Sequence, residues 1–200
     1  MTDSEGTATG FRDDPFPGDV LEQLYLARGV DLRGYRSSTV QRRLSRRLAA
    51  TGCTTCREYL NLLKSRPEEY DRLINSLTIK VSRFFRDPHV FRVLAREVLP
   101  RLAGAASYLC VWSAGCAQGQ EAYSMAILLE HIKETRFPSL KARVVATDID
   151  RDSLVGLGEY PVEMLAEVDS YFLKKYFRRE GSRYRIRGPR CLFWTCSCQI

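Results

Sequence analysis

The sequence has 200 residues, of which 44% are hydrophobic, so it can form one domain or two small ones with a real core. It contains no run of about 18 apolar residues, and we therefore expect no membrane insertion. Residues 1–18 are polar and lack the apolar segment of a signal peptide, which predicts a disordered tail and a cytoplasmic protein.

Cysteine and histidine usage does not predict a metal site. Seven cysteines at scattered spacing argue against a disulfide framework. Cys53 and Cys56 could form half of a zinc site, but the matching pair, Cys196 and Cys198, has poor spacing. We expect reduced thiols and no metal.

The stretch 19–78 predicts a small helical domain, because apolar residues recur at helical spacing and no β-type alternation occurs. Gly29 and Gly52 are placed to end the first two helices. Helix starts are expected at residues that can cap a first turn, namely Asp19, Ser37 or Ser38, and the capping-box patterns at Thr55 and Ser65.

The formal net charge of +7 is concentrated in the second of these helices, because no acidic residue occurs from Leu32 to Arg57. On a helical wheel Val40, Leu44 and Leu48 form an apolar stripe. The arginines outside that stripe are Arg42 and Arg46, which point outward, and Arg43 and Arg47, which flank them. Such a face is either simply solvated or binds an acidic partner, which could be protein, membrane or nucleic acid.

Pro88 begins a helix that we expect to end before Pro100, and after it the chain changes character. The run Tyr108–Trp112 predicts a buried parallel strand. "EAYSMAILLEHIKE" is helical, and "ARVVATDID" is a second strand. Strand, glycine loop, helix and strand form the first unit of a doubly wound sheet, so the predicted fold class is α plus α/β.

The pattern weakens beyond residue 152. "EVDSYFLKKYF" predicts a helix and "SRYRIR" one arm of a hairpin. The last ten residues, "CLFWTCSCQI", show neither strand nor helix periodicity, so no element is expected there.

The glycine loop after the first strand carries the chemistry. Its glycines, Gly115 and Gly119, match neither a P-loop nor GxGxxG. Glu121, in the first turn of the following helix, would repel a phosphate, whereas Asp148 at the end of the second strand can accept hydrogen bonds from a ribose. This combination favours S-adenosylmethionine, which is positively charged. Alternatively, Glu121 only complements the helix dipole and Asp148 caps a turn.

Three motifs in order add specificity: "LINSLTIKVSRFFRDP", "WSAGCAQGQEAYS" and "ATDID". Together they resemble the CheR-type chemotaxis receptor methyltransferases, from about residue 20 to residue 187. The resemblance implies a Rossmann-like domain that methylates receptor glutamates (protein-glutamate O-methyltransferase) with S-adenosylmethionine. Gln120 and Ala122 depart from the family's usual glutamate and proline, and Lys80 from its usual asparagine.

The resemblance also implies roles for individual residues. Arg86 is the candidate catalytic residue, holding either the incoming carboxylate or the cofactor. The implied cofactor-binding residues are Lys80, Ser82, Arg86, Gly115, Glu121 and Asp148. The implied substrate-binding residues, which would face the acidic helices of a methyl-accepting chemotaxis receptor, are Arg42, Arg43, Arg46 and Arg47. No nucleic acid is expected as a partner, and a monomer is expected.

The resemblance stops after "YRIR", and this defines the expected domains. They are a tail (1–18), a receptor-docking helical domain (19–80), a partial S-adenosylmethionine-binding α/β domain (81–187) and an aberrant tail (188–200). With two strands only, one edge of the sheet would be bare and the pocket would lack a wall. The hypothesis is a C-terminally truncated enzyme with weak or absent methyl transfer. The alternatives are a non-catalytic docking module for a receptor or signalling partner and, third, a nucleic-acid-binding arginine helix.

Overall fold

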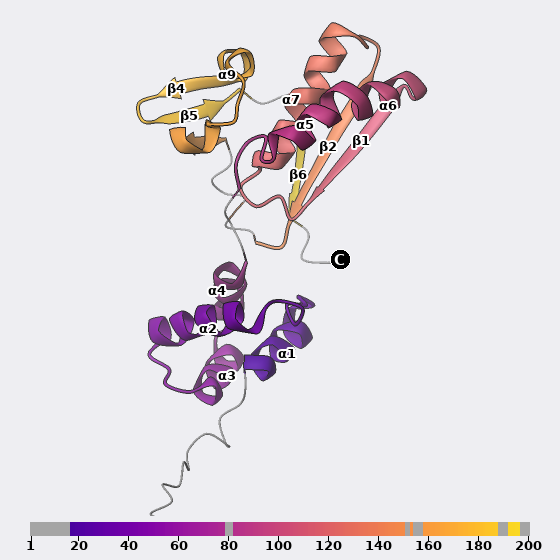
Figure 1. The fold of residues 1–200 in the computed structure, drawn as a ribbon. Coiled ribbons are helices and arrows are strands. Elements are labelled where there is room, and N and C mark those ends of the chain that lie inside the picture. The colour runs from indigo at the N-terminus through magenta and orange to yellow at the C-terminus, as the bar shows by residue number, and fades with distance from the viewer. Residues whose placement is uncertain (1–16, 79–81, 151–152, 154–157, 188–191, 197–200) are drawn as a thin grey trace, which may run out of the picture. The chain divides into compact units, whose positions relative to one another are not determined.

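The computed structural model describes residues 17–78, 82–150, 153, 158–187 and 192–196 (Figure 1). The chain divides into two compact units, and the boundary follows Thr78. Each unit has its own buried apolar side chains. No helix in the described ranges is long and apolar enough to cross a membrane.

In its described residues the first unit has four helices, α1 (Pro17–Arg28), α2 (Ser37–Thr51), α3 (Cys56–Ser65) and α4 (Glu68–Leu77). Their apolar stripes meet in one core, in which Leu24, Tyr59, Leu63 and Leu73 are fully buried. Burial of these side chains is the main source of the unit's stability, because helices of 10–15 residues are marginal alone.

The helix ends follow the expected capping chemistry with three exceptions. α2 begins at Ser37 itself, with Arg36 at the N-cap position and no side-chain cap, so the cap expected at Ser37 or Ser38 is wrong. Thr55 caps α3 by accepting a hydrogen bond from the Glu58 backbone N–H, and Gly52 ends α2 at φ 74°. The capping box expected at Ser65 is wrong, because the Ser65 hydroxyl donates to the Leu62 carbonyl and closes the preceding helix. Asp19 lies inside the first turn of α1 rather than before it.

The second unit contains a parallel sheet in the order β1–β2–β6, formed by β1 (Tyr108–Ala114), β2 (Lys141–Asp148) and β6 (Leu192–Cys196). Helix α7 (Gln120–Thr135) connects β1 to β2 and packs against both strands (Figure 1). Alternate residues of β1 point to opposite faces, and Trp112 on the face away from α7 is 61% exposed.

β6 corrects the expectation that the last ten residues form no element. Leu192–Cys196 pair in parallel with Val144–Asp148, so the described sheet has three strands and β2 lies in its centre. A short uncharged run without alternation is compatible with a strand of a parallel sheet, but periodicity alone cannot distinguish it from irregular chain.

Pro100 does not end the helix before it, contrary to expectation. Helix α5 (Pro88–Val93) continues through a π-helical turn, η1 (Leu94–Val98), into α6 (Leu99–Ala105). The wider turn accommodates a proline that has no N–H to donate and whose ring would clash with a regular preceding turn. Pro88 stands at the first helical position, as predicted.

A second, antiparallel sheet lies between β2 and β6 in the chain, with strand order β3–β5–β4. Its strands are β3 (Glu159–Pro161), β4 (Phe177–Glu180) and β5 (Arg183–Ile186), joined by the short 3-10 helix η2 (Val162–Leu165) and by α9 (Ser170–Tyr176). The helix at 170–176 and the hairpin arm at 183–186 were predicted, whereas β3 was not. Phe177 and Ile186 pair across the sheet and are buried in the core of the second unit.

Candidate cofactor site

The glycine loop connects β1 to α7 through two residues that need a left-handed backbone. Gly115 has φ 70° and Gly119 has φ 86°, a region that glycine enters without steric cost. The N–H groups of Gly115 and Cys116 both donate to the Thr147 carbonyl, at 2.9 and 3.0 Å. The loop is therefore attached to the end of β2.

Asp148 is part of this loop's framework. Its Oδ2 accepts a hydrogen bond of 2.7 Å from the Ala117 N–H, and its Oδ1 accepts one of 2.8 Å from the Asp150 N–H. Ala117 has φ 48°, a strained conformation for a residue other than glycine, which the Asp148 carboxylate helps to hold. The Asp148 carboxylate therefore fixes the backbone on both sides of the loop's attachment to β2.

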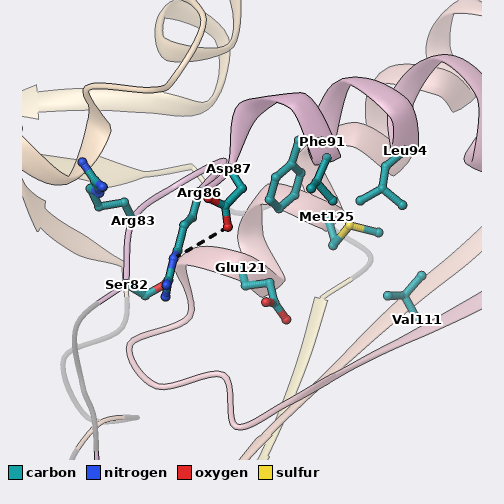
Figure 2. A pocket seen from close by; sticks show the side chains of 10 residues that line it. Ser82, Arg83, Arg86, Asp87, Phe91, Leu94, Val111, Glu121 and Met125 are labelled. Atoms are coloured by element: carbon teal, nitrogen blue, oxygen red, sulfur yellow. Dashed lines mark ion pairs between the residues drawn. The ribbon is translucent and has the colours of Figure 1, made fainter.

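Glu121 lies on the first turn of α7 and is exposed to a cavity of about 400 Å³ (Figure 2). The Ser113 hydroxyl at the end of β1 donates to Glu121 Oε1 at 2.8 Å and so orients the carboxylate. Three apolar side chains, Leu94, Val111 and Met125, form part of the wall. The Glu121 carboxylate therefore stands beside an apolar surface in a cavity that Arg83, Arg86 and Asp87 also line.

Arg86 enters the same cavity from the segment before α5 (Figure 2). Phe85 and Asp87 on either side have φ 50° and 59°, so the backbone around Arg86 is strained, which is common at functional sites. Phe85 is buried, and its N–H donates to the Ser124 hydroxyl at 2.9 Å, which fixes the segment to α7. The Arg86 guanidinium lies 3.9 Å from the Asp87 carboxylate, which partly neutralises its charge.

The structure brings together some of the expected cofactor residues and separates others. Ser82, Arg86 and Glu121 line one cavity. Gly115 and Asp148 are not among its lining residues and instead shape the loop. Lys80 lies outside the described residues, so the structure does not place it.

Comparison with known proteins places the two units in one family. Residues 19–78 match a family model described as the all-alpha domain of CheR methyltransferase, and residues 80–189 match its SAM-binding domain. The chain belongs to the CheR methyltransferase family. Residues 80–189 therefore form a domain that binds S-adenosylmethionine.

Individual relatives agree with the family. The chain is 35% identical to chemotaxis protein methyltransferase 2 of Pseudomonas aeruginosa over 80% of this chain and 57% of that protein. It is 35% identical to the chemotaxis protein methyltransferase of Escherichia coli over 80% of this chain and 55% of that protein. It is also 37% identical to an uncharacterised 104.1 kDa protein of Rhodobacter capsulatus over 85% of this chain and 18% of that protein. The chain thus spans just over half the length of the two methyltransferases.

The cavity fits the cofactor of a CheR methyltransferase. S-Adenosylmethionine carries a positive sulfonium and an ammonium group, and the Glu121 carboxylate supplies the opposite charge. The loop is not suited to a phosphate, because Glu121 stands where a phosphate would meet the N-terminus of α7. Burial and the nearby Asp148 charge raise the pKa of the Cys116 thiol in the loop to about 12, so the Cys116 side chain is neutral at physiological pH.

The four arginines of α2 are not equivalent in this CheR relative. Arg42 and Arg46 are exposed, and neither forms an ion pair with any residue in the described ranges. Arg43 donates to the carbonyls of Leu77 and Thr78, at 2.6 and 2.8 Å, at the end of α4. Arg47 binds Glu69, a buried carboxylate. Two of the four arginines therefore hold the helical unit together.

Sequence reasoning missed the apolar wall of the cavity. Phe91, Leu94, Val111 and Met125 lie on α5, η1, β1 and α7, and their spacing indicates core positions rather than a site. The one sequence feature that could have indicated these residues is the glycine loop, because residues that face such a loop from adjacent elements are candidates for lining a ligand pocket. Among the described residues, no group of three or more histidine, cysteine or acidic side chains could hold a metal ion.

Proposed function

We propose that this protein methylates glutamate side chains of chemotaxis receptors, with S-adenosylmethionine as the methyl donor. The observation that carries the proposal is the cavity that Glu121, Arg86 and Ser82 share beside the glycine loop, in a member of the CheR methyltransferase family. Relatives that cover most of this chain are named chemotaxis protein methyltransferases.

Each proposed cofactor residue has a role that its chemistry allows. Glu121, oriented by Ser113, binds the ammonium group of the cofactor. Asp148 accepts hydrogen bonds from the ribose, and the Gly115 turn lets the backbone approach the ligand closely. Ser82 donates or accepts one hydrogen bond at the cavity wall, and Lys80 remains a proposed contact from the resemblance alone.

The reaction makes few chemical demands on the protein. When bound, S-adenosylmethionine supplies a methyl group on a positively charged sulfur. A substrate glutamate, with an ordinary pKa of about 4.3, is ionised at neutral pH and needs no general base. Arg86 holds this carboxylate in line, so the protein contributes mainly proximity and orientation. Formation of the ester removes one negative charge from the receptor.

Arg42 and Arg46 form the proposed receptor-docking face, because both side chains are exposed and cationic. A basic face steers an acidic helical surface and mainly raises the association rate. Arg43 and Arg47 add to the positive potential but are hydrogen-bonded within the unit. Arg43 donates to the Leu77 and Thr78 carbonyls, and Arg47 donates to Glu69. The proposal places the protein in the cytoplasm and treats it as a monomer.

The test is transfer of a labelled methyl group from S-adenosylmethionine to a cytoplasmic receptor fragment. Base-labile label on receptor glutamates is the expected result. In the double variant Arg42→Glu with Arg46→Glu, transfer should fall most at low salt, while cofactor affinity stays unchanged. Receptor binding without any label would favour the docking-module alternative, and steep salt-dependent binding to random DNA would favour the nucleic-acid alternative.

A further inference from the structure

A tyrosine of the small antiparallel sheet reaches the glycine loop. Tyr160, on β3, is only 1% exposed, and its hydroxyl donates to the Gln118 carbonyl at 2.6 Å. The same oxygen lies 3.4 Å from the Gly158 N–H, a weaker contact. Residues 42 positions apart in the chain are thus joined at the loop that precedes α7.

The Gln118 carbonyl is a sensitive point of that loop. The peptide unit is planar, so a fixed carbonyl also fixes the direction of the Gly119 N–H, which donates to the Cys116 carbonyl at 2.8 Å. Gly119 has φ 86° and precedes α7, where glycine's freedom would otherwise permit the peptide to rotate. The Tyr160 hydroxyl therefore limits the conformations available immediately before Glu121.

The segment that carries Tyr160 also contacts the other wall of the cavity. The Tyr160 ring packs edge-on against Phe84, with centroids 4.8 Å apart. Phe84 lies two residues before Arg86, and its backbone N–H donates to the Met164 carbonyl at 3.2 Å. The fully buried Gln120 amide contacts the Met164 sulfur at 3.3 Å. β3 and η2 thus support both the loop and the arginine segment.

We propose that Tyr160 is a positioning residue of the cofactor site, whose hydroxyl holds the glycine loop in its ligand-binding conformation. This inference rests on the proposed function, because it takes the loop as part of the S-adenosylmethionine site. Under this proposal the small antiparallel sheet supports the cofactor site, because a change that moves β3 also changes the glycine loop. Tyr160 acts through the Gln118 carbonyl and need not touch the cofactor.

The variant Tyr160→Phe tests this proposal because it keeps the ring and its contact with Phe84 but removes the hydroxyl. The matched control is Tyr176→Phe, since Tyr176 is also buried and its hydroxyl has no hydrogen-bond partner in the described part of the chain. If Tyr160 only fills the core, both variants behave like the wild type. If it positions the loop, only Tyr160→Phe changes the site.

Two measurements on the full chain are needed. Amide hydrogen exchange should become about tenfold faster for residues 115–120 in Tyr160→Phe, as expected for loss of one hydrogen bond to a buried carbonyl, while exchange at Met125–Leu129 in α7 stays unchanged. The dissociation constant of S-adenosylhomocysteine, measured by calorimetry, should rise by about the same factor. Tyr176→Phe should change neither quantity.

The outcomes separate this inference from the proposed function. Unchanged loop exchange in Tyr160→Phe overturns the inference even if the wild type binds the ligand. Faster exchange with unchanged affinity overturns it too, because the hydroxyl would then hold the loop without positioning the ligand. A wild type that binds neither S-adenosylmethionine nor S-adenosylhomocysteine overturns the cofactor site itself, and the role of Tyr160 in ligand binding with it.

Discussion

Arg47 and Glu69 bind one another across α2 and α4, although the sequence placed Arg47 on a face for an external partner. The guanidinium makes two hydrogen bonds to the carboxylate, of which the Nη2–Oε2 bond measures 2.7 Å. Glu69 is only 2% exposed and also accepts a hydrogen bond of 2.9 Å from the Tyr59 hydroxyl. The basic helix therefore has an interior function in the helical unit as well as an exposed face.

Replacing Arg47 by methionine should destabilise the helical unit. The change leaves a buried carboxylate without its main partner, which costs roughly 3 kcal/mol in the free energy of unfolding. The control Arg46→Met removes an exposed arginine of the same helix and should cost less than about 0.5 kcal/mol. Hydrogen exchange of α2 and α4 measures the effect within this unit. Equal losses in the two variants would contradict the role given to the Arg47–Glu69 pair.

The same pair predicts a pH dependence. Burial raises the pKa of Glu69, but hydrogen bonds from Arg47, Tyr59 and Arg72 outweigh it and hold the pKa below its ordinary value of 4.5. A group with a lowered folded pKa stabilises the fold above its unfolded pKa, and this stabilisation is lost as the pH falls through the folded pKa. The difference in unfolding free energy between wild type and Glu69→Gln should therefore be large at pH 6 and shrink toward pH 3.

A neighbouring exposed acid serves as the control for that measurement. Glu68 precedes Glu69 on the first turn of α4 but is exposed. Glu68→Gln should differ little from the wild type at any pH, because a solvated side chain contributes little. If the two variants show the same pH profile, Glu69 is not the titrating group.

The sequence predicted those parts of the fold that depend on local patterns. The Thr55 cap, the helix end at Gly52 and the strand–loop–helix around Gly115 each follow from residues close together in the chain. β3 was missed because a strand of three residues is too short to show periodicity. The hydrogen-bond partner of its buried Tyr160 also lies in a loop far away in the sequence. β6 was missed because its partner strand, β2, lies more than 40 residues earlier.

The site was predictable only in its residue types. Glu121 was identified from its place after a glycine loop, and in the structure it lines a cavity. The sequence could not predict that Arg43 hydrogen-bonds to the end of α4 or that Arg47 hydrogen-bonds to Glu69. A helical wheel does not show which neighbouring helix supplies the acceptors. Asp148 was expected to face a ligand, and this stays a prediction; the structure adds that its carboxylate holds the loop backbone, which the sequence did not indicate.

Glu121→Gln should weaken cofactor binding without unfolding the protein. The side chain is exposed to the cavity, so its loss costs little stability. A charge-assisted hydrogen bond to the cofactor ammonium is worth about 1.5–3 kcal/mol, so the dissociation constant of S-adenosylmethionine should rise roughly 10- to 150-fold. Ser113→Ala should cause a smaller rise, since it only orients the carboxylate.

Glu97→Gln is the matched control for that change, because Glu97 is an exposed acid on η1 that does not line the cavity. Calorimetry on all three variants tests the assignment. An unchanged affinity in Glu121→Gln would show that the carboxylate does not meet the cofactor.

Cys116 should be much less reactive than Cys110 in the folded protein. Burial, with a further contribution from the Asp148 charge, raises the pKa of Cys116 to about 12, whereas Cys110 is exposed on β1. At pH 8 a thiol of that pKa is about 0.01% thiolate, the form that reacts with maleimides. N-Ethylmaleimide followed by peptide mass spectrometry should therefore modify Cys110 first, and both cysteines equally fast in guanidinium chloride. Because Cys116 lies in the glycine loop, Tyr160→Phe should speed its modification. Rapid labelling of Cys116 in the native wild type would contradict the burial of its thiol.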